Sequence, residues 1–285
     1  MYSYHSRVNP NPRNAFTVLD EPSLQGLVGY MKSRKCRHVV LMVSISTSAG
    51  IPDFRSPRTG ELHTWYLFEH NLAKLNLPFP EAVFDLSYFR ENPQPFYTLA
   101  HELYPGKYNP TLTHAFIRVL DNHNLLHRCF TQNIDTLERR AGVPPSKIVE
   151  AHGSFASQRC IGCRRPFDDE RMKRCVLNRI VPRCETCNSL VKPDIVFFGE
   201  SLPLEFARAA REVPLADLLI IIGTSLTVNP FAALANMPSE LCPRVLINLE
   251  QVGDLGFRPD DVLLLGKCDE VVHKLCRELG WENEL

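Results

Sequence analysis

The amino-acid sequence predicts an α/β fold, a Rossmann-like doubly wound parallel sheet that carries a smaller lobe. Short apolar runs of strand length alternate with helical segments along the chain, as expected for parallel strands joined by helices. Polar side chains follow directly after several of these runs, and two C-x2-C pairs interrupt the alternation. Ligands of open α/β sheets bind at the carboxyl ends of the strands, so these polar residues are candidates for a binding site.

The N-terminal part predicts one helix and the first strand. Residues 1–20 are predicted to be a flexible leader, and residues 24–33 carry apolar side chains at helical spacing. Residues 39–43 are all apolar, the pattern of a buried parallel strand. The small and polar residues 44–50 follow. A strand, a turn of small residues and a helix start can hold a pyrophosphate, although an ordinary strand-to-helix turn has the same composition.

Residues 59–111 are rich in aromatic residues and proline and contain no strand-like run. They predict a helical insert outside the main sheet, whose aromatic side chains form a small core of its own rather than a cofactor site. An amphipathic helix over residues 113–121 then leads back to the sheet.

Two short apolar runs deliver polar side chains to one edge of the sheet. Residues 125–131 are expected to end at Gln132, Asn133 and Asp135, and residues 148–150 are expected to carry His152 to the same edge. An alternative interpretation is a polar loop whose Asn and Asp cap a helix that starts near Thr136.

Four cysteines have the spacing of a zinc site. Cys160 and Cys163 form one C-x2-C pair, and Cys184 and Cys187 form a second pair that is separated from the first by 20 residues. Four thiolates suit a closed tetrahedral site, so one structural Zn²⁺ is expected to stabilise this module without taking part in chemistry.

The remaining residues predict four strands and two helices. Strands are expected at residues 195–198, 218–222, 245–250 and 262–266, and helices at 206–212 and 269–280, with Gly280 as the C-terminal stop. Gly223, Thr224 and Ser225 follow the third-last strand and predict either a phosphate or ribose site or an ordinary glycine turn. Asn248 and Glu250 could hold ribose hydroxyl groups or an adenine edge.

Composition excludes several classes of function. The chain of 285 residues has 32 basic and 32 acidic side chains, so it predicts neither direct nucleic-acid binding nor membrane binding. No apolar run approaches the ~18 residues of a spanning helix, and the N-terminus lacks a secretory signal. Ten cysteines in such a chain predict a reducing, intracellular location. The absence of acidic residues from residues 1–19 slightly favours the mitochondrial matrix over the cytoplasm or nucleus.

The motifs together resemble the sirtuins, the NAD-dependent protein-lysine deacylases. The resemblance covers about residues 22–283 and includes residues 51–56, 131–135, 150–153, 192–200, 223–226 and 248–250, together with the two C-x2-C pairs. It implies a catalytic domain over residues 21–285. The large lobe would comprise residues 21–58, 112–156 and 190–285, and the small lobe the insert 59–111 and the zinc module 157–189.

The resemblance also implies a role for each motif. Asp53, Phe54 and Arg55 would close over the nicotinamide ribose, Gln132 would bind that ribose, and Asn133, Ile134 and Asp135 would hold the carboxamide of nicotinamide. The rest of NAD+ would contact Ile45, Ser46, Thr47, Gly223, Thr224, Ser225, Asn248, Leu249, Glu250 and the backbone of Cys268. An extended acetylated peptide would add as a strand to Val196, Phe197, Phe198, Gly199 and Glu200.

The implied reaction is deacetylation of lysine, in which the acetyl group passes to ADP-ribose and nicotinamide is released. His152 would be the general base for a ribose hydroxyl group, and Asn133 the second catalytic residue. Acetylated lysine proteins or peptides would be the partners. No Tyr-x-x-Arg pair stands where relatives use one for acidic acyl groups, so neutral acyl chains are expected.

Two segments depart from the family pattern. Ser44 alone stands where the family has Gly-Ala-Gly, and residues 61–70 occupy ten positions where relatives have about three. A serine lacks the glycine freedom to approach a phosphate closely. The alternative function is therefore a catalytically impaired sirtuin-like protein that binds acylated peptides. A mono-ADP-ribosyltransferase is a lesser alternative, which the mass of the product distinguishes.

Overall fold

The computed structural model describes residues 17–51 and 77–285. Asp53, Phe54, Arg55 and the insertion 61–70 lie outside the described residues, as does most of the predicted leader. The backbone N–H groups of Val18 and Leu19 donate to the Asp260 carboxylate at 2.8 and 3.0 Å, and Leu19 is buried. Packing against the domain therefore begins at least at Val18, before the predicted boundary at residue 21.

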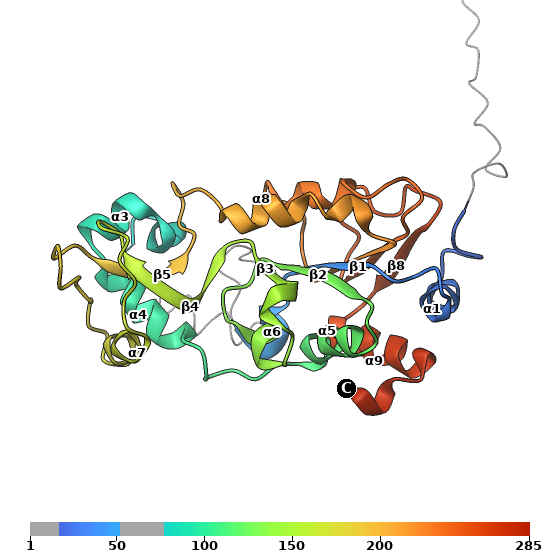
Figure 1. The fold of residues 1–285 in the computed structure, drawn as a ribbon, viewed down its shortest axis with the longest axis horizontal. Helices are drawn as coiled ribbons and strands as arrows, with labels where there is room; N and C mark the ends of the chain where they lie inside the picture. Colours follow the sequence, from blue (N-terminus) through green and yellow to red (C-terminus); the bar gives the residue numbers. More distant parts are fainter. Residues whose placement is uncertain (1–16, 52–76) are drawn as a thin grey trace, which may run out of the picture.

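A six-stranded parallel sheet forms the centre of the large lobe, which confirms the predicted fold class (Figure 1). Its order is β3-β2-β1-β6-β7-β8, so the chain builds one half outward from β1 and returns to build the other half from β6. The crevice between the ends of β1 and β6 is the position where doubly wound folds bind ligands. The strands are β1 (Val39–Val43), β2 (Leu126–Thr131), β3 (Ile148–Glu150), β6 (Leu218–Ile222), β7 (Arg244–Asn248) and β8 (Asp261–Leu265).

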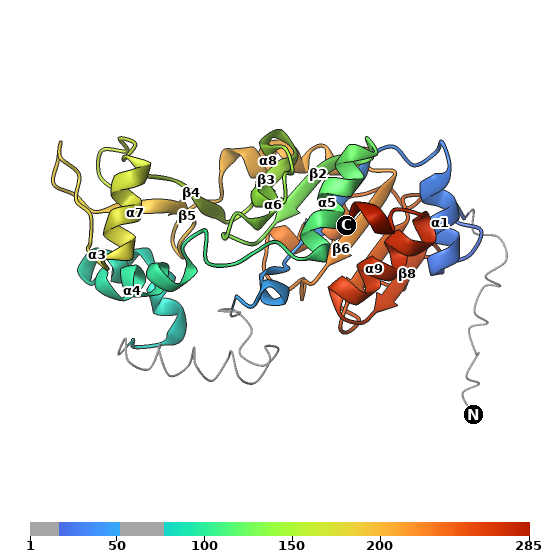
Figure 2. The ribbon, with the colours of Figure 1, turned by 90° about the horizontal axis from the view of Figure 1, so that it is seen from below.

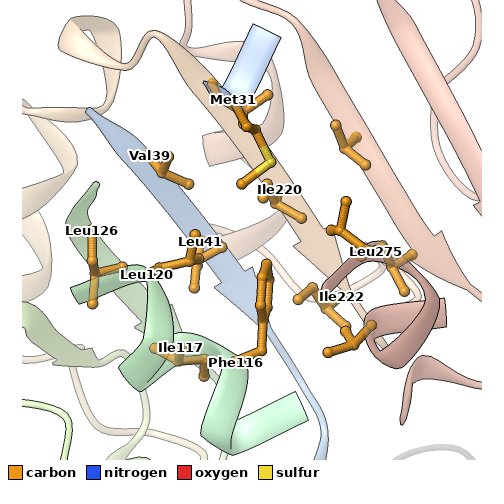
Figure 3. Close-up of a cluster of buried hydrophobic side chains, with 14 of the residues drawn as sticks. Met31, Val39, Leu41, Phe116, Ile117, Leu120, Leu126, Ile220, Ile222 and Leu275 are labelled. Atoms are coloured by element: carbon orange, nitrogen blue, oxygen red, sulfur yellow. The ribbon is translucent and has the colours of Figure 1, made fainter. Parts of the chain in front are cut away.

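Alternating side chains of these strands pack against helices on both faces. Val39, Leu41 and Val43 face one side, where they meet α1 (Leu24–Lys32), α5 (Leu112–Asn122) and α9 (Cys268–Leu279). Figure 3 shows Phe116 and Leu120 of α5 beside Leu41 in this core. On the opposite face, α8 (Leu204–Ala210) and η6 (Phe231–Asn236) cover Val40 and Met42. Because both faces are covered, the central strands β1 and β6 are buried at every position and consist of apolar residues alone.

The small lobe lies at the end of the molecule opposite α1 and α9 (Figure 2). Its two-stranded antiparallel sheet joins β4 (Gly153–Cys160) to β5 (Val191–Ile195), and α7 (Asp169–Leu177) packs beside it. The lobe also contains η3 (Pro80–Phe84), α3 (Leu86–Glu91) and α4 (Gln94–Leu103). The short elements elsewhere are η2 (Ser46–Ala49), α6 (Leu137–Arg140), η4 (Pro145–Lys147), η5 (Val213–Leu215) and η7 (Glu282–Glu284).

Two predictions about residues that lie in this lobe need correction. The strand expected at residues 195–198 is instead β5, because a two-stranded ribbon has open edges and tolerates Pro193, which has no N–H to donate. The described aromatic residues of the helical insert, from residue 79 onward, do not form a core separate from the zinc module. Phe89 and Phe96 pack against Phe197 at ring-centroid distances of 5.5 and 5.0 Å. They share one core with residues of the zinc module such as Met172.

Candidate functional site

A pocket of about 250 Å³ opens at the carboxyl ends of β1, β2, β6 and β7. Most of the residues predicted to bind the cofactor meet here, although they come from segments far apart in the chain. Those that line the pocket are Ser46, Thr47, Gln132, Asn133, Ile134, Asp135, Gly223, Thr224, Ser225, Asn248, Leu249, Glu250 and Cys268.

Seven lining residues were missed by the cofactor-site prediction, namely Ser44, Ile51, Phe84, Leu103, Ile195, Thr227 and Val228. Phe84 and Leu103 belong to the helical insert, and Ile195 ends β5. Phe84 and Leu103 belong to no motif identified in the sequence, so no local signal marks them. Ile45, by contrast, was predicted to contact the cofactor, but it is buried and does not line the pocket.

The Asn133 and Asp135 side chains tie the end of β2 to the turn after β1. Asn133 Oδ1 accepts the Ile45 N–H at 2.8 Å, and the Ser46 hydroxyl group donates to Asp135. Asp135 also accepts the Leu137 N–H at 2.8 Å, at the start of α6. The capping interpretation therefore describes part of what Asp135 does. Burial raises the pKa of Asp135, against the opposing effect of its hydrogen bonds from Ser46 and Leu137.

A second carboxyl group, Glu138, lies beneath this site. The residue is 1% exposed, and its Oε1 has no hydrogen-bond partner within the described part of the chain. The Thr131 hydroxyl group hydrogen-bonds the Glu138 side chain and also accepts the Asn133 N–H at 3.0 Å. Burial, followed by the charge of Asp135, raises the pKa of Glu138 to about 8. Glu138 is therefore largely protonated at neutral pH.

Replacing Glu138 by glutamine is expected to flatten the pH dependence of stability between about pH 5 and 8. In this window the folded parent retains a proton that the unfolded chain has lost, so its free energy of unfolding falls as pH rises. E138Q does not titrate, and its stability relative to the parent should rise with pH by on the order of a few kcal/mol. Urea unfolding at several pH values measures this.

The matched control for this experiment is E240Q, because the Glu240 side chain is 80% exposed. It should retain the slope of the parent. An E138Q variant whose free energy of unfolding varies with pH as steeply as that of the parent would contradict the role of Glu138.

Gln132 joins the pocket to His152. Its side-chain Oε1 accepts the Thr224 hydroxyl group at 2.8 Å, and its backbone carbonyl lies 3.0 Å from Nδ1 of His152. Because a carbonyl oxygen only accepts, Nδ1 carries the proton of the neutral ring and Nε2 carries the lone pair. The residue is 5% exposed, and its ring lies 6.4 Å from that of Phe231. His152 is thus held in one tautomer and one orientation.

Gly223 allows the ends of β1 and β6 to approach closely. Its φ is +67°, and a Cβ at this position would lie 2.6 Å from the Ser44 carbonyl oxygen. The Ser44 N–H donates to the Ile222 carbonyl at 3.0 Å. Any other residue at position 223 would therefore force the two strand ends apart and change the floor of the pocket.

The residues predicted to bind the peptide form a loop next to His152. The Val196 N–H donates to the carbonyl oxygen of His152 at 2.8 Å. Phe197 is buried in the small-lobe core, whereas Phe198 is 55% exposed. We call residues 196–200 the substrate loop.

The four cysteines predicted to bind zinc lie together at the end of the small lobe. Their Sγ atoms all lie within 4.8 Å of one another, with 3.4 Å between Cys160 and Cys187 and 3.6 Å between Cys163 and Cys184. A tetrahedral Zn²⁺ with Zn–S bonds of about 2.3 Å requires sulfur atoms about 3.8 Å apart. The cluster therefore fits one zinc ion with no position left for a substrate.

Within residues 17–51 and 77–285, no helix has the length and apolar character needed to cross a membrane.

Comparison with known proteins identifies the family. The model of the Sir2 family matches residues 43–230. NAD-dependent protein deacetylase hst2 of Schizosaccharomyces pombe is 50% identical over 265 residues, which cover 92% of this chain and 78% of that protein.

Two further relatives match over a similar length. NAD-dependent protein deacetylase hst2-1 of Emericella nidulans is 54% identical over 271 residues, covering 94% of this chain and 73% of that protein. NAD-dependent protein deacetylase sirtuin-3 of Mus musculus is 48% identical over 267 residues, covering 92% and 78%. With its zinc-type cysteine cluster and its pocket at the switch point of the sheet, the chain belongs to the Sir2 family.

Proposed function

We propose that this protein is an NAD-dependent protein-lysine deacetylase that transfers the acetyl group to ADP-ribose and releases nicotinamide. The observation that carries the proposal is the position of Gln132, whose side chain lines the pocket and whose backbone orients His152. A dinucleotide site and a general base are thereby joined at one edge of the sheet. The names of the three relatives support the same activity.

The donor and acceptor groups of the pocket fit NAD+. The backbone at Ser44 and Gly223 forms the floor of the pocket. Because Gly223 has no Cβ, the cofactor can approach this backbone closely. Thr224 and Ser225 offer hydroxyl groups to the pocket. The Asn248 amide donates to the Glu250 carbonyl at 2.9 Å, and both residues line the pocket together with Cys268. When bound, NAD+ supplies a glycosidic bond whose cleavage makes an acceptor for the acetyl group. In the proposal, Asn133 and Asp135 orient the carboxamide.

His152 takes the proton in the proposed mechanism. Its Nδ1–H is engaged by the Gln132 carbonyl, so Nε2 is the atom that accepts a proton from a ribose hydroxyl group. The resulting imidazolium keeps the hydrogen bond to the Gln132 carbonyl, which stabilises the charged form. Because the substrate loop is bonded to the His152 backbone, a peptide added along that loop would bring its acetyl-lysine toward the same base.

The test is an assay of the purified protein with NAD+ and an acetylated lysine peptide. We expect release of nicotinamide in equal amount to deacetylated peptide, with O-acetyl-ADP-ribose as the second product by mass spectrometry. Mass gained by the peptide or the protein would instead indicate an ADP-ribosyltransferase. Absence of nicotinamide release by protein that binds the peptide would overturn the proposed activity.

That last outcome would support the second candidate, an impaired binder of acylated peptides. The observation in its favour is Ser44, the single residue that follows β1 where the family pattern has Gly-Ala-Gly. Ser44 lines the pocket, and its carbonyl oxygen approaches Gly223, so this turn bears directly on dinucleotide binding.

Two finer predictions belong to the same proposal. The acyl groups accepted would be neutral, because the sequence lacks the Tyr-x-x-Arg pair expected for acidic ones. A mitochondrial matrix location, with the cytoplasm or nucleus as the alternative, is supported by the absence of acidic residues from residues 1–19.

A further inference from the structure

Lys192 is a cation buried in the small lobe, outside the set of predicted site residues. The residue is 5% exposed, and its Nζ lies 2.9 Å from the Glu200 carboxylate. It also donates to the carbonyl oxygens of Ile195 at 2.7 Å and Pro193 at 3.3 Å, so all three of its N–H donors have acceptors. The ammonium group lies 4.6 Å from the centroid of the Phe197 ring.

Glu200 transmits this contact to the substrate loop. Its Oε2, which faces Lys192, also accepts the Phe197 N–H at 2.9 Å, and its own N–H donates to the Phe197 carbonyl at 2.9 Å. The carboxylate thus closes the loop around Gly199, whose φ is +91°. Lys192 therefore contacts Ile195, the residue that directly precedes the substrate loop, and Glu200, the last residue of that loop.

The rest of the loop is held by backbone hydrogen bonds. The Val196 N–H donates to His152, as described above, and the Phe198 N–H donates to the Phe84 carbonyl at 2.8 Å. The Phe198 carbonyl in turn accepts the Leu86 N–H at 3.2 Å. With Phe197 turned inward and Phe198 turned outward, the loop presents a defined outer surface next to the catalytic histidine.

A buried ion pair is a poor source of stability, because desolvation of both charges offsets most of their attraction. Burial lowers the pKa of Lys192, and the nearby Glu200 carboxylate opposes this shift. The ion pair instead fixes the positions of the groups that surround the ammonium group. A single ammonium group brings two carbonyl oxygens and a carboxylate to one point, which an apolar side chain of similar volume cannot do.

We propose that Lys192 is a positioning residue for the acetylated substrate, which acts through its ion pair with Glu200 to preform the substrate loop. This inference rests on the proposed deacetylase function. Because Lys192 is directed to the loop and the nucleotide pocket is built mainly on the large sheet, its removal should weaken binding of peptide rather than of NAD+.

The experiment compares Lys192→Met with the parent and with Lys173→Met, a matched control on the exposed part of α7. Steady-state kinetics are recorded with the acetylated peptide and NAD+ varied in turn. We expect K192M to raise KM for the peptide at least tenfold while KM for NAD+ stays within about threefold, and K173M to match the parent. A merely structural role would reduce the concentration of active protein without changing KM for the peptide.

Glu200→Gln keeps the shape of the side chain and removes its charge, so it tests the same ion pair if K192M does not fold. E200Q should also raise KM for the peptide, and the double variant should show less than the product of the two single effects. Folded K192M or E200Q with KM for the peptide within twofold of the parent would overturn the inference. Failure of the proposed function itself is recognised separately, because the parent would then release no nicotinamide.

Discussion

Replacing His152 by alanine is expected to reduce the rate of O-acetyl-ADP-ribose formation by a factor of about 10² to 10⁴, the range for loss of a general base. The alanine cannot accept a proton at the position of Nε2. Among the described residues, the Asp135 carboxylate is held by Ser46 and Leu137, and the buried Glu138 is largely protonated at neutral pH, so neither is suited to replace the imidazole. Quenched-time assays with product detection by mass spectrometry measure the rate.

The structural effect of the change should be small by comparison with its effect on rate. The Gln132 carbonyl that accepts the Nδ1–H of His152 belongs to the backbone, so this group remains in the variant. Binding of NAD+, measured by calorimetry, should therefore change far less than the rate. The control is H273A, since His273 lies on α9 with its side chain 45% exposed. Folded H152A that retains more than a tenth of the parent rate would contradict the assignment of His152 as the base.

Removal of the zinc ion is expected to unfold the small lobe and abolish activity. Structural zinc sites contribute about 10–16 kcal/mol of binding free energy in small zinc domains. Here Cys160 and Cys184 are part of the core that also contains Phe197 of the substrate loop. Loss of the metal would therefore remove the support of the loop as well as of the module. The core between the large sheet and α1, α5 and α9 contains no residue of the zinc module and should persist.

Metal analysis and thiol titration check this prediction. The parent should contain about one zinc ion per chain, and Cys184→Ser should contain almost none. Chelation should expose four additional reactive thiols. Cys175→Ser is the matched control, because Cys175 lies on α7 outside the cluster and should leave both metal content and activity unchanged. Full activity in protein shown to lack zinc would refute a structural role for the ion.

The two parts of the fold differed in how far their strands could be predicted. The central strands of the large sheet, β1 and β6, are buried on both faces, so each appears in the sequence as an uninterrupted apolar run. β5 gives no such signal, because its sequence contains Lys192, Pro193 and Asp194. Lys192 can be buried because it forms an ion pair with Glu200, eight positions later in the sequence. Secondary-structure propensities cannot anticipate such a pairing.

Local and periodic patterns were enough to predict the polar residues at the strand ends, the metal-type cysteine spacing and the family to which the chain belongs. Which of those strand ends meet in one pocket follows from three-dimensional packing alone. The bond from Ile45 to Asn133, the burial of Glu138 and the ion pair under the substrate loop depend on the path of the chain between distant segments. The distance between such groups depends on the packing of the whole domain. This packing produces no regular spacing of residues that could be recognised in the sequence.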